Sequence, residues 1–202
     1  MLDLVLRPIK ERLFAPVARA VGSRVSPLAV TLAGLVVGLG AAVLVARAAY
    51  VAGLVCWLAN RLLDGLDGTL ARSQGASSDF GGYVDIVVDF VVYATIPIAF
   101  VLAVPTVATS LAALSLLACF YVNAASWMYL AAILERRDAG ARSRDELTTI
   151  TMPEGLVGGT ETVLLYTTFF LWPERVAPLF LLVAALVLAT VCQRIAWASR
   201  RL

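Results

Sequence analysis

The sequence predicts an all-α integral membrane protein, in which six transmembrane helices follow an N-terminal amphipathic surface helix. Of its 202 residues, 61% are hydrophobic, and the mean hydropathy is +0.89. Soluble domains contain only about 45–50% apolar residues. Several apolar runs also approach the length of about 20 residues that a helix needs to cross a bilayer. A chain this short cannot bury so much apolar surface in one soluble core, so lipid should cover much of it.

The N-terminal segment has the pattern of a helix that lies on a membrane surface. Its apolar residues recur at spacings of three and four, which places them on one helical face: Leu2, Leu6, Ile9, Leu13 and Val17. Basic residues lie between them, a composition typical of interfacial helices. We therefore expect residues 1–26 to form an amphipathic juxtamembrane segment and residues 27–202 to form one six-span domain.

Prolines and polar loops separate the six predicted spans. The first span begins after Ser26 with Pro27, and proline is well tolerated in the first turn of a helix. Gly34 and Gly38 form a GxxxG pair that allows close contact with another helix. The expected spans are 27–49, 50–72, 79–104, 107–134, 159–173 and 177–198.

The arginines predict the orientation of the spans. They cluster in the N-terminal segment, beside the loop 73–78, in the loop 135–158 and at the C-terminal end. Six spans place all four clusters on one side, and short loops rich in Lys and Arg stay in the cytoplasm. The formal net charge of only +2 does not suggest a nucleic-acid partner.

Four aspartates lie on the second and third spans, close to the loop that joins them. Asp64 and Asp67 are three residues apart and Asp85 and Asp89 are four apart, so each pair shares a helix face. Each would cost about 2.5–3.5 kcal/mol near the bilayer centre, which favours a polar cavity open to the cytoplasm. Converging carboxylates are tolerated only when they are protonated or bound to cations.

The donor atoms favour hard cations over zinc. The chain contains no histidine, and carboxylate oxygens suit Mg²⁺, Mn²⁺ or Ca²⁺. Two divalent ions would balance four carboxylates, and a two-metal clamp is a known device for displacement at phosphorus. Gly68, Gly81 and Gly82 would let a bulky ligand approach the backbone, and Arg72 could meet a phosphate.

These residues together resemble a family signature. The stretch Asp64-x2-Asp67-Gly68-x2-Ala71-Arg72-x8-Gly81-x3-Asp85-x3-Asp89 is similar to the signature of the CDP-alcohol phosphatidyltransferases at all eight positions. The six-span layout, the surface helix and the Ser-Pro-x3-Thr start of the first span also resemble that family. The likeness therefore covers most of the chain.

The resemblance implies a role for each matching residue. Asp64, Asp67 and Asp85 would hold two divalent cations, Mg²⁺ or Mn²⁺, and Asp89 would contact the second ion and act as the general base. Further residues would surround the CDP group: Gly68, Ala71, Arg72, Ser78, Gly81, Pro27 and Thr31. The implied enzyme moves a phosphatidyl group from CDP-diacylglycerol to a small alcohol acceptor and releases CMP. It would be a homodimer in a prokaryotic inner (plasma) membrane, with the active site facing the cytoplasm.

Several alternatives stay open at this point. The enzyme could be an aminoalcohol phosphotransferase, in which diacylglycerol attacks CDP-choline or CDP-ethanolamine. The acids could instead mark the path of a small divalent-cation transporter, because intramembrane acids also line ion paths. They could also be structural ion pairs with Arg61, Arg72 and other arginines, although the two nearby arginines do not balance four acids. A scaffold without activity would be expected to have a broken motif, and this motif is intact.

The acceptor site is left open by the sequence. Glu161 could point into it or cap the fifth span. Three residues at the end of the fourth span could bind an anionic acceptor or form a positively charged cytoplasmic flank: Glu135, Arg136 and Arg137. Arg194, Asn123 and Ser126 could line the cavity or join neighbouring helices, and Arg194 could instead extend to the membrane surface.

Overall fold

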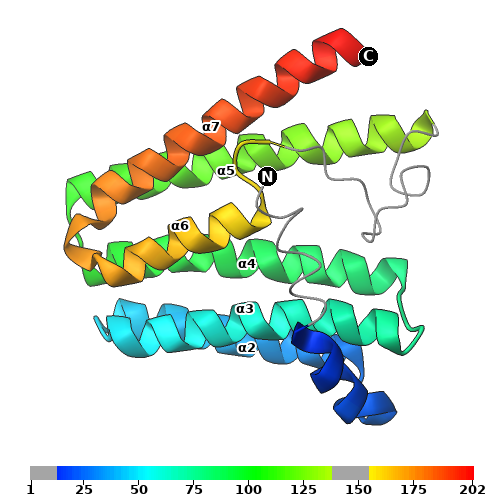
Figure 1. Cartoon of the computed structure of the whole chain (residues 1–202). Helices are drawn as coiled ribbons and strands as arrows, with labels where there is room; N and C mark the ends of the chain where they lie inside the picture. Colours follow the sequence, from blue (N-terminus) through cyan, green and yellow to red (C-terminus); the bar gives the residue numbers. More distant parts are fainter. Residues whose placement is uncertain (1–12, 138–154) are drawn as a thin grey trace.

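The computed structural model describes residues 13–137 and 155–202, the side chain of Ser23 excepted, and in these ranges the secondary structure is helical with no strand. Residues 1–12 of the predicted surface segment and most of the loop 135–158 lie outside the described residues. Figure 1 shows the helices as a bundle of long rods, with the helix of residues 13–21 lying across its lower edge. The elements that follow are η1 (Gly22–Arg24), α2 (Pro27–Ala46), α3 (Tyr50–Ser73), α4 (Asp79–Ala103), α5 (Val107–Arg136), α6 (Gly159–Leu171), η3 (Pro173–Arg175) and α7 (Val176–Arg201).

Four of the described helical segments are long and apolar enough to cross a membrane. They are α2, α4, α5 and the continuous stretch of η3 and α7, Pro173–Arg201. Helix α3 fails that criterion because it carries Arg61, Asp64, Asp67 and Arg72, and α6 fails because it has only 13 residues. The all-helical prediction is therefore confirmed, and four of the six expected spans meet the length and composition of a membrane helix.

Polar side chains cap the N-termini of three of the long helices. The Oγ of Ser26 accepts a hydrogen bond from the amide of Ala29 at 3.2 Å at the start of α2. Ser78 caps α4 through the amide of Gly81 at 3.1 Å, and Thr106 caps α5 in the same way. These caps satisfy backbone donors that have no partner within the helix. The first span ends at residue 46, three residues before the predicted end, because Ala48 has a positive φ of 58° that breaks the helix.

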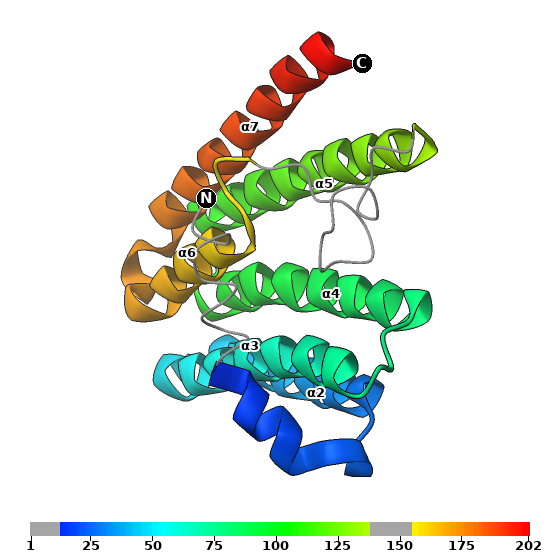
Figure 2. The same cartoon turned by 45° about the vertical axis from the view of Figure 1, so that its right-hand side comes forward.

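The helices pack in two groups. Helix α2 lies along both α3 and α4, α5 lies along α7, and α6 contacts α3 and α7 between the two groups. Figure 2, turned by 45°, shows the same order, with α2 and α3 at one side and α7 at the other. The described helix of residues 13–21 packs on the outside of the first group, where Ala18 meets Val30 and Leu70. Leu13 and Val17 on that helix are exposed.

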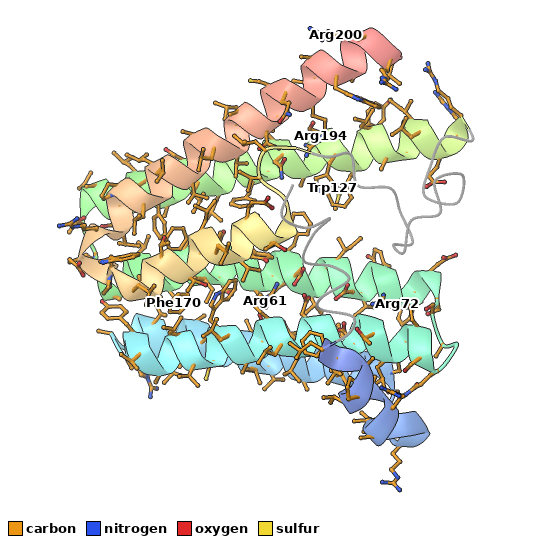
Figure 3. All side chains as sticks on the ribbon, viewed as in Figure 1. Arg61, Arg72, Trp127, Phe170, Arg194 and Arg200 are labelled. Carbon is orange, nitrogen blue, oxygen red and sulfur yellow. The ribbon has the colours of Figure 1, made fainter. Side chains whose placement is uncertain are left out.

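An aromatic core holds the bundle at the end away from the α3–α4 loop. Its largest members are fully buried: Trp57, Phe100, Tyr166, Phe169 and Phe180. Their ring centroids lie between 4.7 and 6.3 Å apart in stacked, tilted and edge-to-face pairs, and aromatic quadrupoles favour the stacked and edge-to-face arrangements. In Figure 3, Phe170 lies near one end of the bundle and Arg72 near the other, with Arg61 between them. The core therefore fixes α3, α4 and α6 on one side of the acidic residues.

The predicted GxxxG contact is present and gives a stability test. A methyl group on Gly38 would lie 2.7 and 3.0 Å from the two methyl carbons of buried Val92 on α4, and a β-branched side chain can hardly turn away. We expect Gly38→Ala to lower the free energy of unfolding by about 1–3 kcal/mol. Thermal unfolding in detergent measures this effect.

Gly40 is the matched control because it lies on the same helix and has open space around it. Replacing a glycine inside a helix with alanine favours the helix by up to about 1 kcal/mol. Gly40→Ala should therefore unfold at the wild-type temperature or slightly above it. Equal stability of the two variants would show that α2 and α4 are not in the close contact described here.

Candidate active site

The four aspartates line one small cavity, as their spacing predicts. Its empty space, open mouth included, is about 180 Å³. Helix α3 contributes Asp64 and Asp67, and α4 contributes Asp85 and Asp89. The remaining lining residues come from the same two helices and from α2: Thr31, Gly34, Asn60, Arg61 and Val88. Thr31 is thus the predicted nucleotide neighbour that the structure brings into contact with the acids.

Thr31 orients one of the four carboxylates. Its hydroxyl donates to Oδ2 of Asp67 at 2.6 Å, and both side chains are buried. Such a short bond to an ionised acceptor is stronger than a neutral one. The same hydroxyl lies 3.2 Å from the carbonyl oxygen of Pro27, one turn earlier on α2. Pro27 does not line the cavity but begins the helix that carries Thr31.

Arg61 is the single cation among the residues that line the cavity. Its Nη2 donates to Oδ1 of Asp89 at 2.9 Å, and its Nη1 lies 4.0 Å from Oδ1 of Asp64. Within the described residues, Asp85 forms no hydrogen bond or ion pair. One guanidinium against four carboxylates leaves a formal excess of three negative charges. Ion pairing with Arg61 therefore explains how the charge of Asp89 is compensated, and it compensates that of Asp64 only weakly.

Five predicted nucleotide residues lie nearer the α3–α4 loop, outside the cavity lining. They are Gly68, Ala71, Arg72, Ser78 and Gly81. The guanidinium of Arg72 folds over Gly68, where a methyl group would lie 3.3 Å from Nη1. Ser78 and Gly81 are joined by the cap of α4. These residues thus sit at the loop end of the same hairpin, beside the acids and not among them.

The structure shows what holds several of the candidate acceptor residues. The carboxylate of Glu161 accepts from the amide of Gly158 at 3.2 Å, so it caps the start of α6. Glu135 and Arg136 are the last two residues of α5. Nη1 of Arg137 donates to the backbone oxygen of Leu202 at 3.2 Å, and this hydrogen bond joins the end of α5 to the end of α7.

Arg194 joins α7 to α5 and does not extend to the surface. Its side chain is buried, and its Nη1 lies 3.0 Å from Oδ1 of Asn123 and 3.3 Å from Oγ of Ser126. Its Nε has no hydrogen-bond partner among the described residues. Figure 3 shows Arg194 on the side of α7 that faces α5. Of the three sequence interpretations, bonding between neighbouring helices is the one the structure supports.

The cavity suits divalent metal ions in donor type and charge. Within the described part of the chain, no three carboxylate, cysteine or histidine side chains already form a complete metal-binding group. The lining nevertheless supplies four carboxylates and one hydroxyl, which are hard oxygen donors. Asp85 has no hydrogen bond or ion pair among the described residues, so its side chain could rotate toward an ion without breaking one. The acids would have to close around an ion by side-chain rotation.

Sequence reasoning missed how completely Arg61 is held at the cavity. Asn60 and Tyr93 both accept hydrogen bonds from its guanidinium, and neither was predicted as a site residue. One signal could have indicated it: an arginine inside an apolar span, three residues before Asp64, must face a polar partner. The partners themselves come from two different helices and depend on the packing.

Comparison with known proteins agrees with this geometry. Residues 24–197 match the family model of CDP-alcohol phosphatidyltransferases. The chain is 35% identical over 196 residues to the inner membrane protein YnjF of Escherichia coli (strain K12), an alignment that covers 96% of this chain and 94% of that protein. It is also 33% identical over 85 residues to the bifunctional IPC transferase and DIPP synthase of Thermococcus kodakarensis, covering 42% of this chain and 19% of that protein.

Solved structures with a similar fold include the phosphatidylinositol phosphate synthase PgsA1 of Mycobacterium tuberculosis. Its structure with CDP-DAG bound has a TM-score of 0.70 at 21% sequence identity and covers 92% of both chains. Its complex with manganese and citrate has the same TM-score and identity, and covers 91% of this chain and 87% of that one. At this identity the likeness shows a shared fold.

Proposed function

The chain belongs to the CDP-alcohol phosphatidyltransferase family and is an enzyme of that class, and from this premise we propose that it transfers a phosphatidyl group from CDP-diacylglycerol to a small polar alcohol. CMP is the second product. The observation that carries the proposal is the cavity lined by Asp64, Asp67, Asp85 and Asp89, which come from two helices joined by a short loop. Carboxylates gathered in this way must be protonated or bound to cations, and divalent cations held by carboxylates commonly bind the phosphates of a substrate.

Each residue of the site has a proposed task. Asp64, Asp67 and Asp85 would hold two divalent cations, Mg²⁺ or Mn²⁺, with Asp89 also in contact with the second. When bound, such ions neutralise charge on phosphate oxygens and on the leaving group. Thr31 keeps Asp67 in one orientation through its hydrogen bond.

The chain's own chemistry is proton transfer and positioning. Asp89 takes the proton of the acceptor hydroxyl while that oxygen attacks the phosphorus of the phosphatidyl group. A new phosphodiester bond forms, and the bond from phosphorus to the CMP oxygen breaks. Further residues at the loop end of the hairpin would lie against the CDP group: Gly68, Ala71, Arg72, Ser78 and Gly81.

The topology completes the proposal. The apolar helices and the similarity to an inner membrane protein indicate an integral membrane protein. Helix α3 packs along α2, and α6 packs on α3. We therefore take α3 as the second span and α6 as the fifth, which completes six spans in a domain covering 27–202. Residues 1–26 would lie along the cytoplasmic surface, which the acidic cavity also faces. A homodimer in a prokaryotic inner membrane is the proposed assembly.

A release assay tests this function. Purified protein with Mg²⁺ or Mn²⁺ and CDP-diacylglycerol should release CMP only when an accepted alcohol is added, from a panel of glycerol 3-phosphate, inositol, inositol phosphate and serine. Chelation of the divalent ions should stop the release, because the carboxylates would then repel the donor's phosphates. The lipid product identifies the acceptor.

Two outcomes would point to the other functions. CMP release from CDP-choline or CDP-ethanolamine with diacylglycerol, and none from CDP-diacylglycerol, would indicate an aminoalcohol phosphotransferase. Uptake of a divalent cation by liposomes without any CMP production would indicate a transporter. A heat-treated sample and empty liposomes serve as controls for the two measurements.

A further inference from the structure

We propose that Arg61 is a positioning residue, which fixes Asp89 for the reaction and stays in the cavity as a built-in cation when divalent ions bind. The proposal rests on the proposed function, because it gives Arg61 a part in that reaction. Arg61 lies outside the family signature described above, which begins at Asp64. Its importance is visible only in its contacts.

Three nitrogens of the guanidinium each have a separate acceptor. Nε donates to Oδ1 of Asn60 at 2.8 Å, Nη1 to the hydroxyl of Tyr93 at 3.0 Å, and Nη2 to Oδ1 of Asp89 at 2.9 Å. The side chain is only 8% exposed. Because the guanidinium is planar and rigid, three acceptors on different sides determine its orientation.

Two aromatic rings also lie close to the guanidinium. The central carbon of the guanidinium lies 5.0 Å from the ring centre of Trp57 and 4.9 Å from that of Tyr93. Both distances are within the range of cation–π attraction. The indole nitrogen of Trp57 donates to Thr167 on α6, and the hydroxyl of Tyr166 donates to the backbone oxygen of Tyr93. Helix α6 therefore fixes the rings that fix Arg61.

Asn60 connects this hydrogen-bond network to α2. Its amide nitrogen donates to the carbonyl oxygen of Gly34 on α2 at 2.8 Å, which directs its Oδ1 toward Arg61. The groups that contact the guanidinium come from α3 and α4, and α2 and α6 hold those groups in place. A cation needed only for charge balance would not require this many fixed partners.

The network has a consequence for Asp89. Its Oδ1 is occupied by Arg61, whereas no described residue bonds to its Oδ2. One oxygen is therefore held and the other is available for the acceptor or an ion. The positive charge that holds Asp89 also repels an incoming divalent ion. Arg61 should therefore weaken metal binding while it increases turnover, an opposition that a purely structural ion pair would not produce.

The test compares Arg61→Gln and Arg61→Lys with the wild-type protein in detergent. We expect Arg61→Gln to bind Mn²⁺ about tenfold more tightly, measured on the metal-free protein by electron paramagnetic resonance, because a nearby positive charge is gone. Its kcat for CMP release should fall about 100-fold, since a misplaced catalytic group has an effect of that size. Arg61→Lys should keep the Mn²⁺ affinity and still lose turnover, because an ammonium cannot reproduce the rigid fork.

Two controls separate this role from others. Arg47→Gln removes an exposed arginine at the far end of α2 and should change neither quantity. Arg61→Gln combined with Asp89→Asn should be no slower than Asp89→Asn alone, because Arg61 acts through Asp89.

Three results would overturn the proposal. They are weaker Mn²⁺ binding together with lower turnover in Arg61→Gln, wild-type kcat in Arg61→Lys, and additive losses in the double variant. If Arg61→Gln does not fold, Arg61→Lys decides the question. If the wild-type protein releases no CMP, the proposed function fails, and the Mn²⁺ affinities still report separately on Arg61.

Discussion

Asp89→Asn should release CMP at least about 10³-fold more slowly than the wild-type protein, because a general base alone contributes about 10²–10⁴-fold. An amide cannot take the proton of the acceptor hydroxyl, and it adds no negative charge for an ion. The substitution keeps the shape of the side chain, and the amide oxygen can still accept from Nη2 of Arg61, which now lies 2.9 Å from Oδ1. The initial rate of CMP release measures the loss, and the thermal unfolding temperature tests the fold.

Asp79→Asn is the matched control for this variant. Asp79 lies on the same helix as Asp89, is exposed, and does not line the cavity. Asp79→Asn should leave the rate of CMP release unchanged. It should lower the free energy of unfolding by about 0.3–1 kcal/mol, because a negative charge in the first turn interacts favourably with the helix dipole. Release at the wild-type rate by Asp89→Asn would remove Asp89 from the mechanism. An equal loss in both variants would indicate that α4 is sensitive to substitution in general.

The meeting of the four acids could be predicted because it depends only on local geometry. Residues three or four apart share a helix face, and a short loop brings the loop-proximal ends of two helices to the same depth. The starts of α2 and α4 were predictable for a similar reason, since Ser26-Pro27 and Ser78 lie at the first turns. The early end of α2 was not predicted, because the positive φ of Ala48 has no signal in an apolar sequence.

The surroundings of Arg61 could not be predicted because they depend on how helices rotate against one another. Its partner Tyr93 lies 32 residues away on α4, and Trp57 is held by Thr167, 110 residues away on α6. Nothing in the periodicity of a nearly uniform apolar helix specifies which face meets which neighbour. The role of Glu161 could not be predicted for the same reason. The sequence is compatible with an acceptor-binding role or with a helix cap, and the structure shows its carboxylate accepting a hydrogen bond from the amide of Gly158.

Asp85→Asn should make the metal-free protein more stable and the enzyme inactive. Asp85 has no hydrogen-bond or ion-pair partner among the described residues, so its amide breaks no existing bond. It also removes one of three excess negative charges from the cavity, which lowers the repulsion among the acids. We expect the unfolding temperature without divalent ions to rise by about 2–4 °C, the shift that about 1 kcal/mol gives in a chain of this size. The stabilisation on adding Mg²⁺ or Mn²⁺ should largely disappear, and CMP release should fall at least about 10²-fold, as expected when transition-state electrostatics are lost.

Asp67→Asn distinguishes charge relief from a general gain in stability. It removes the same charge from the same cavity, but it also weakens the 2.6 Å hydrogen bond that Thr31 donates to Asp67. A hydrogen bond to a charged group contributes about 1.5–3 kcal/mol, which is enough to cancel the relief of repulsion. The metal-free Asp67→Asn protein should therefore be no more stable than wild type, although it loses the response to metal in the same way. If Asp85→Asn instead lowers the metal-free unfolding temperature, the carboxylates are not repelling one another. In that case they must be protonated or paired, and the cavity would no longer have the charge excess that makes divalent ions its expected ligands.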